Sequence, residues 1–232
     1  MAILIKTLWA YFAALMGVFY WSTSALIRSR LGLAGQEIYW KNSVIWSKFL
    51  LRLSGIEVKI TGLNNLEFSG PKVYIANHQS NFDIPCLMSS IERPFSFIVK
   101  KELFKVPIMG WYMKKRGDIS VDRKNPRSAM KTLVSISKRI SAGEVFLIFP
   151  EGTRSLDGKV GEFKKGSLFL AVQNEAKIIP IGISGSINIQ KKGSHLIKPS
   201  MVTINIGIPI KASKELENAT IRQAIISLMA QK

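Results

Sequence analysis

Residues 73–83, VYIANHQSNFD, contain the most informative pattern of the chain. The first four residues are apolar and β-prone, which predicts a buried strand. Polar residues follow directly, and a helical pattern then runs from about Asp83 to Ile91. A buried strand that leads through a polar loop into a helix is typical of α/β proteins, in which active sites tend to lie at strand ends.

The alternation of strand and helix continues along the chain. The pattern predicts further strands over residues 56–61, 95–99, 119–121, 145–149, 178–183 and 201–208. It predicts further helices over residues 127–141, 161–176 and 214–230. We therefore expect residues 55–232 to form one α/β domain with a mainly parallel or mixed sheet flanked by helices. Pro180 indicates that its strand lies at an edge of this sheet or contains a bulge.

The composition limits the classes of function. The chain has 232 residues, and its 47% hydrophobic fraction excludes a disordered chain. Its 33 Lys and Arg against 15 Asp and Glu give a net charge of +18, which attracts nucleic acid, anionic lipid or acidic partners. A single cysteine, Cys86, excludes a disulfide framework, and we expect it to be a small buried residue. High apolarity together with positive charge favours a membrane surface.

Residues 1–54 are expected to form a membrane-associated helical hairpin. No charged residue lies between Lys6 and Arg28, and as a helix this run reaches roughly 30 Å, about the thickness of the hydrocarbon core of a bilayer. Residues 39–53 predict a second, basic amphipathic helix, with the turn near residues 32–35. A cleaved signal peptide and a buried core helix are the alternatives. Whether the first helix spans the membrane or lies in the interface stays open.

His78 and Asp83 are the first candidates for catalysis. On one regular helix their spacing would point them away from each other, so they can meet only if His78 lies in the loop and Asp83 in the first turn of the next helix. Ser80 or Asn81 is expected to cap that helix. A carboxylate bonded to one imidazole nitrogen leaves the other nitrogen free to accept a proton. The alternative is a capping loop with an incidental histidine.

A second polar cluster, FPEGTRS at residues 149–155, follows another predicted strand. Arg154 offers a fork-shaped donor that matches a phosphate or a carboxylate. Gly152 allows the backbone to approach a ligand closely. Glu151 is expected either to orient Arg154 or to hold the loop. A turn with a salt bridge and no function is the alternative.

Together with two weaker clusters, these residues resemble the glycerolipid acyltransferase family. Asn77, His78 and Asp83 match its first block, in which four residues separate His and Asp. Residues 117–123, residues 149–155 and the strand with Pro180 look like the other three blocks. The resemblance covers about residues 56–208, and the N-terminal hairpin fits the bacterial branch. It implies transfer of a fatty acyl group from an acyl thioester to the sn-2 hydroxyl of lysophosphatidic acid, which gives phosphatidic acid.

The residues and the resemblance together predict a role for each site residue. His78 would act as general base on the acceptor hydroxyl, with Asp83 holding the ring. Arg154 and Lys100 would bind the substrate phosphate. Arg123 is a further phosphate-binding candidate, unless it pairs with an aspartate of its own cluster. The candidates for stabilising the oxyanion are the backbone N–H groups of the loop at Glu151, Gly152 and Thr153.

We expect no bound cofactor and no metal, with acyl-CoA or the thioester of an acyl carrier protein as co-substrate. Residues 100–131 contain ten basic and three acidic residues, so this surface would recruit anionic lipid and an acidic carrier protein. The alternative is a solvated basic face beside an ordinary core helix. The apolar residues within 103–113 would cover a dry slot for the fatty chain. The expected partners are a membrane phospholipid surface, lysophosphatidic acid and the thioester donor, without nucleic acid. The expected location is the cytoplasmic face of the inner membrane.

Two alternative functions remain. The acceptor can be another lysolipid, glycerol 3-phosphate, or a lipid A or ornithine-lipid precursor. A non-catalytic basic module that binds a membrane or nucleic acid would explain the charge and the apolar N-terminus. It would not explain the spacing of His78 and Asp83 beside the residue 149–155 cluster. The acyl-chain length, the identity of the thioester carrier and the oligomeric state cannot be inferred from the sequence.

Overall fold

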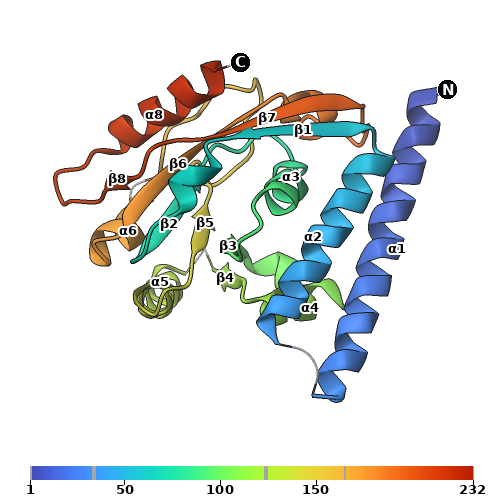
Figure 1. Cartoon of the computed structure of the whole chain (residues 1–232), viewed down its shortest axis with the longest axis horizontal. Coiled ribbons are helices and arrows are strands. Elements are labelled where there is room, and N and C mark those ends of the chain that lie inside the picture. The colour runs from blue at the N-terminus through green and yellow to red at the C-terminus, as the bar shows by residue number, and fades with distance from the viewer. Residues whose placement is uncertain (1, 33–34, 123–124, 165, 232) are drawn as a thin grey trace.

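The computed structural model describes residues 2–32, 35–122, 125–164 and 166–231. In these residues eight strands form one sheet in the order β1-β7-β6-β2-β5-β3-β4, with β8 beside β6 (Figure 1). The strands are β1 (Ile56–Thr61), β2 (Lys72–Ala76), β3 (Ser96–Lys100), β4 (Ile119–Val121), β5 (Phe146–Ile148), β6 (Lys177–Ser184), β7 (Ser200–Ile206) and β8 (Ile210–Lys211). β7 and β8 run antiparallel to β6, and the other neighbouring strands are parallel. The predicted α/β class with a mainly parallel or mixed sheet is confirmed.

Helices cover both faces of the sheet. They are α1 (Ala2–Arg30), α2 (Gln36–Leu53), α3 (Asp83–Ser90), α4 (Met109–Arg116), α5 (Pro126–Ser141), α6 (Phe169–Gln173), α7 (Ser186–Ile189) and α8 (Asn218–Ala230), with the short 3-10 helices η1 (Leu63–Leu66) and η2 (Lys101–Lys105). In β2, Val73 and Ile75 belong to the core formed with α5, α6 and α8, whereas Tyr74 and Ala76 belong to the core formed with α2 and α3. Because both faces are buried, this strand is apolar throughout.

The two N-terminal helices pack against each other and against α3 and α4, at the right of Figure 1. The predicted hairpin is therefore confirmed, although residues 33 and 34 of its expected turn lie outside the described residues. Gly17 lies at the α1–α2 contact, where a Cβ atom would come within 2.3 Å of the Trp46 ring. Residues Ile3–Arg30 are long and apolar enough to cross a membrane, and only 22% of the apolar window is buried. Such exposure is not expected of a buried core helix.

The helix predicted over residues 161–176 is largely wrong, because among the described residues of this range only Phe169–Gln173 is α-helical. The backbone N–H of Gly161 donates to the Glu151 carboxylate, and that of Lys164 donates to the Pro150 carbonyl. The Lys164 N–H would take part in the hydrogen-bond ladder of such a helix, but here it is bonded to the residue 149–155 loop; the first N–H groups of a helix have no partner within it. The helix predicted from residue 214 begins later, at Asn218.

The edge position predicted from Pro180 is also wrong. β6 lies inside the sheet, between β2 on one side and β7 with β8 on the other. The Pro180 carbonyl accepts the N–H of Gly207, just beyond the end of β7 and before the start of β8. Since the N and the carbonyl of one strand residue point to the same side, the missing N–H of Pro180 faces this break between two strands. A central strand therefore tolerates the proline.

Candidate active site

The loop after β2 brings His78 and Asp83 together. β2 ends at Ala76, His78 lies in the loop, and Asp83 is the first residue of α3. The His78 Nδ1 atom lies 2.7 Å from Asp83 Oδ2. The Asp83 side chain is fully buried, whereas 16% of the His78 side chain is exposed. This is the arrangement that their spacing required.

Asp83 is positioned by three donors from two parts of the chain. Its Oδ2 atom accepts the backbone N–H groups of Gln79 at 2.7 Å and Ser80 at 2.9 Å, and its Oδ1 atom accepts the hydroxyl of Ser186. The expected capping by Ser80 or Asn81 is wrong: the helix begins after Phe82, and no side chain caps it. The Asp83 carboxylate itself accepts the N–H groups of the preceding loop, which fixes the orientation of the carboxylate toward His78.

The imidazole of His78 lies flat against the ring of Phe149, with a centroid distance of 4.1 Å and an interplanar angle of 16°. Because Nδ1 faces the carboxylate of Asp83, this nitrogen carries the proton of the hydrogen bond. The opposite nitrogen, Nε2, is then the one that can accept a proton from a substrate.

Glu151 holds two loops, which was one of the two roles expected for it. Its Oε1 atom accepts the backbone N–H of His78, and its Oε2 atom accepts that of Gly161, both at 2.8 Å. A third link joins the clusters, because the N–H of Ser155 donates to the His78 carbonyl at 2.7 Å. Burial raises the pKa of the Glu151 carboxyl above its ordinary value, and the two backbone hydrogen bonds oppose this shift.

Two residues not predicted as part of the site complete the polar network. Asn77 bonds to Ile183 in β6, with its Nδ2 donating to the carbonyl at 2.9 Å and its Oδ1 accepting the N–H at 2.7 Å. This explains an asparagine in the first block, since it ties the loop of His78 to the strand of the fourth block. Ser186 follows the same strand, and its hydroxyl reaches Asp83 from the first turn of α7. The sequence contains one signal for Ser186 as a site residue, the Gly185-Ser186 pair directly after a predicted strand.

The predicted phosphate-binding residues differ in their surroundings. Arg154 is partly exposed and has no ion-pair or hydrogen-bond partner within the described parts of the chain. Lys100 is exposed at the end of β3, with its Nζ atom 3.7 Å from the Glu102 carboxylate. Arg123 lies outside the described residues. Of the aspartates in its cluster, Asp118 pairs with the buried Arg116 and Asp122 pairs with Lys101.

The loop of the third cluster turns at Gly152, whose φ of +68° is left-handed. The Gly152 N–H donates to the Phe149 carbonyl at 3.1 Å, which closes the turn. The next residue, Thr153, is exposed, and its hydroxyl accepts a hydrogen bond from the ammonium of Lys192 at 2.8 Å. Lys192 was not predicted as a site residue, because its loop shares no pattern with the other clusters.

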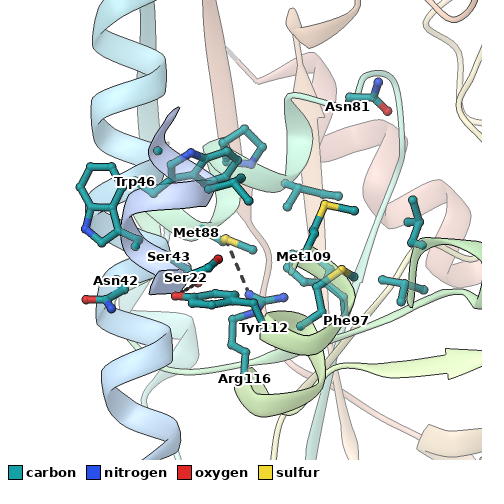
Figure 2. Close-up of a pocket in the computed structure, with 18 residues that line it drawn as sticks. Ser22, Asn42, Ser43, Trp46, Asn81, Met88, Phe97, Met109, Tyr112 and Arg116 are labelled. Carbon is teal, nitrogen blue, oxygen red and sulfur yellow. Dashed lines mark hydrogen bonds between the residues drawn. The ribbon is translucent and has the colours of Figure 1, made fainter. Parts of the chain in front are cut away.

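An apolar cavity of about 390 Å³ lies between the N-terminal hairpin and the sheet (Figure 2). Residues of α1, α2, α3, β3, η2 and α4 line it, among them Leu103, Met109 and Met113 from the stretch expected to cover a dry slot. Asn81, at one end of the cavity in Figure 2, belongs to the loop of His78. Phe97 of the cavity wall stacks on Phe149, with ring centroids 6.3 Å apart. The cavity therefore approaches the imidazole.

A buried ion pair forms part of the wall of this cavity. Arg116 lines the cavity, and its guanidinium pairs with Asp118 and lies 5.1 Å from the centroid of the Phe97 ring. Asp118 in turn accepts the backbone N–H of Phe97 at 2.8 Å. The charge of Arg116 is thus compensated within the protein, and we assign it no substrate.

Comparisons with known proteins agree with this geometry. Residues 57–184 match the model of a family described as Acyltransferase. A 1-acyl-sn-glycerol-3-phosphate acyltransferase from Pseudomonas aeruginosa is 31% identical over 219 residues, which are 91% of this chain and 82% of that protein. The chloroplastic enzyme LPAT1 of the same name from Arabidopsis thaliana is 38% identical over 68% of this chain but only 45% of its own length. The chain thus spans about half the length of such plant relatives.

A solved structure resembles the whole chain. The crystal structure of the 1-acyl-sn-glycerophosphate (LPA) acyltransferase PlsC from Thermotoga maritima superposes with a TM-score of 0.85 and 28% sequence identity. The alignment covers 100% of this chain and 98% of that one, so it includes the two N-terminal helices. With the family match over more than half of its residues, the chain belongs to the acyltransferase family.

Proposed function

We propose that this protein transfers a fatty acyl group from an acyl thioester to the sn-2 hydroxyl of lysophosphatidic acid, which yields phosphatidic acid. The observation that carries this proposal is the His78–Asp83 pair, 2.7 Å apart, whose loop contributes Asn81 to the wall of an apolar cavity and is bonded through the His78 carbonyl to Ser155, the neighbour of Arg154. A fatty chain, a hydroxyl and a phosphate each have a matching group there. The names of the relatives in Pseudomonas and Arabidopsis support the choice of acceptor.

His78 acts as a general base in this reaction. Its Nε2 atom takes the proton of the acceptor hydroxyl while the oxygen attacks the thioester carbonyl carbon. The carbon–oxygen bond forms, the tetrahedral intermediate collapses, and the carbon–sulfur bond breaks. The proton on His78 then passes to the departing thiolate, so the enzyme returns to its starting state. Asp83 holds the ring and stabilises the imidazolium during the step.

The transfer is direct, without an acyl-enzyme intermediate. Ser80 is the nearest serine in sequence, but its hydroxyl is buried and donates to the Gln190 carbonyl at 2.9 Å. Cys86 is fully buried in α3, and burial raises the pKa of its thiol, which disfavours the nucleophilic thiolate. Neither side chain is arranged as a nucleophile beside His78.

Arg154 binds the phosphate of the acceptor, with Lys100 as a second cation. An unpaired guanidinium at the protein surface keeps its full donor capacity for a phosphate. The backbone N–H groups around Glu151, Gly152 and Thr153 stay the predicted donors for the oxyanion. The N–H of Gly152 already donates to Phe149. The backbone of the loop must therefore adjust before that group can serve.

The apolar cavity holds the fatty chain of the thioester. Its volume of about 390 Å³ lies in the usual range of ligand pockets, roughly 300–1,000 Å³. Helices α1 and α2 form one side, so the slot lies next to the part of the protein with the most exposed apolar surface. A chain extracted from a bilayer would then pass from one apolar environment to another.

Residues 1–54 serve as the membrane anchor and residues 55–232 as the catalytic domain. Large apolar side chains of α1 are exposed over most of its length, including Leu8, Trp9, Phe12, Leu15, Phe19 and Tyr20. Exposed apolar surface of this extent is typical of a membrane-binding region. The net charge of +18 favours the anionic cytoplasmic leaflet, where both the acceptor and the thioester donors are accessible.

An acceptor comparison tests this function. Purified protein is assayed with lysophosphatidic acid, glycerol 3-phosphate and an uncharged monoacylglycerol, each with coenzyme A and acyl-carrier-protein thioesters. We expect phosphatidic acid as the main product and its loss in the His78→Ala variant. A higher kcat/KM for another acceptor would overturn the substrate assignment, and full activity of His78→Ala would overturn the mechanism.

A further inference from the structure

The loop of residues 190–197 connects the catalytic loop with the anchor helix. The carbonyl of Gln190 accepts the Ser80 hydroxyl at 2.9 Å, and its side-chain Oε1 accepts the Asn81 amide at 3.2 Å. On the other side, the Gln190 Nε2 donates to the Tyr11 hydroxyl of α1 at 2.9 Å. The Tyr11 hydroxyl in turn donates to the carbonyl of His195 at 3.1 Å.

A second contact holds the end of the same loop. The hydroxyl of Thr7 in α1 accepts the N–H of Ile197 at 3.1 Å and lies 3.3 Å from the carbonyl of that residue. Thr7 and Ile197 are both buried, so water does not compete with these bonds. Side chains of α1, the anchor helix, therefore hold both ends of the residue 190–197 loop: Tyr11 bonds to Gln190, and Thr7 bonds to Ile197.

This loop places Lys192 at the third cluster. Its ammonium donates to the neutral Thr153 hydroxyl at 2.8 Å, and no carboxylate pairs with it in the described residues. A lysine ammonium has three donors, so two remain for a ligand. Thr153 is adjacent in sequence to Arg154, which also lacks an ion-pair partner there. One cation thus contacts Thr153 and another belongs to the next residue, and an anion with several oxygens would stabilise two cations for which no described carboxylate is a partner.

We propose that Lys192 and Arg154 together bind the phosphomonoester of the acceptor, with the Thr153 hydroxyl between them, and that Tyr11 of the anchor helix positions the lysine. This inference rests on the proposed function and names a further binding residue for it. A terminal phosphate has three free oxygens and close to two negative charges, so it can accept from both cations at once. The anchor helix thereby helps to build the headgroup site as well as to hold the protein at the membrane.

The chain offers a matched control in Lys191. It is the neighbouring residue, is exposed and has the same charge, but its ammonium contacts neither Thr153 nor any carboxylate of the described residues. Replacing Lys191 removes the same charge from the same loop. A comparison of the two lysines therefore separates a specific contact from general attraction to an anionic surface.

The experiment measures kcat and KM of the full-length protein for lysophosphatidic acid in Lys192→Met, Lys192→Arg, Lys191→Met and Tyr11→Phe. For Lys192→Met we expect the KM of the acceptor to rise about tenfold, the size of one lost charged hydrogen bond. The kcat and the KM of the thioester should stay within about twofold of wild type. Lys192→Arg should retain most of the affinity, Lys191→Met should resemble wild type, and Tyr11→Phe should raise the acceptor KM by a smaller factor.

Vesicle composition distinguishes the substrate phosphate from lipid headgroups. In neutral phosphatidylcholine vesicles the KM difference between wild type and Lys192→Met should persist. A difference that appears only in anionic phosphatidylglycerol vesicles would overturn the assignment, as would equal effects of both lysine variants. An unchanged KM with a lower melting temperature would assign Lys192 a structural role and also overturn it. A wild-type protein that forms no phosphatidic acid would instead overturn the proposed function.

Discussion

The site has two polar parts, a first part around His78 and a second part around Thr153. They differ in how many of their polar and charged groups have hydrogen-bond or ion-pair partners within the protein. Around His78, the side-chain groups of Asp83 and Glu151 accept hydrogen bonds from the loops that surround them. Around Thr153, in contrast, Arg154 and Lys192 carry charges that no described carboxylate neutralises.

This difference separates two tasks. Groups that move a proton must keep one geometry through the reaction, so hydrogen bonds within the protein hold them before the substrate arrives. Cationic groups that bind an anion do so with higher affinity when they have no carboxylate partner in the free protein, because an internal ion pair would have to break before the anion could bind. Substitutions in the first part are expected to change kcat or stability, and those in the second to change KM.

The largest effect is expected at the imidazole. Replacing His78 by Ala removes the base and should lower kcat by roughly 10²- to 10⁴-fold. Asp83→Asn should lower kcat as well, because an amide can donate to Nδ1 and favour the wrong tautomer. Steady-state assays with saturating substrates measure both, and circular dichroism checks folding. A His78→Ala variant with an unchanged kcat would show that this part of the site has no role in proton transfer.

A change in the second part should affect binding instead. Arg154→Ala removes a charged donor and should raise the KM of lysophosphatidic acid by roughly 10- to 100-fold with a smaller effect on kcat. The control is Lys131→Ala, which removes an exposed charge from α5. With a monoacylglycerol acceptor, Arg154→Ala should make no difference. An acceptor KM that does not respond to this substitution would remove Arg154 from the phosphate site.

A substitution of Glu151 tests whether hydrogen bonds within the protein hold the loops around His78 in place. In Glu151→Gln, one of the two backbone N–H groups of His78 and Gly161 would face an amide NH₂ group. This should lower the free energy of unfolding by about 1–3 kcal/mol, measured by urea unfolding in detergent. Stability equal to wild type would mean that the two hydrogen bonds do not hold the loops.

The difference in stability between wild type and Glu151→Gln should also depend on pH. Because burial raises the pKa of Glu151 above 4.5, the folded state holds this proton more tightly than the unfolded chain does. The wild type therefore gains stability relative to Glu151→Gln as the pH falls through the window just above 4.5. It loses that gain as the pH rises past the raised pKa. The difference between the two unfolding curves should accordingly be larger in acid than at neutral pH.

The smallest effect is expected outside both parts, at Cys86. Cys86→Ala should leave kcat and KM unchanged, because the buried thiol makes no hydrogen bond to His78 or Asp83 within the described residues. The small void should lower the free energy of unfolding by about 1 kcal/mol. Activity should likewise survive treatment with a thiol reagent. Loss of transfer in Cys86→Ala without loss of stability would point to a covalent route and contradict the direct mechanism.

The predictions from sequence succeeded where the pattern was local. The strand, loop and helix at residues 72–90 follow from apolar content and spacing, and this order allows His78 and Asp83 to meet, as they do in the structure. The helix expected over residues 161–176 is largely wrong, because the Pro150 carbonyl accepts the Lys164 N–H that such a helix would have used. A pattern within one segment contains no information about acceptors supplied by another.

Pro180 and Lys192 illustrate the same limit. From sequence alone Pro180 indicates an edge strand or a bulge, because no local feature reports that β7 ends opposite it and β8 begins further on. The lysine lies in a loop without a recognisable motif, and only the contacts of that loop with Tyr11 and Thr153 bring it to the site.

The order of apolar and polar residues was sufficient to specify an α/β chain with an apolar N-terminal hairpin and a histidine–aspartate pair, because the relevant interactions involve neighbours in sequence. Packing was needed to choose the partners of each charge: Glu151 with two loops, Arg116 with Asp118, and neither Arg154 nor Lys192 with any described acid. Whether a charge is neutralised depends on groups from distant segments within a few ångströms. Those distances exist only once the chain has folded.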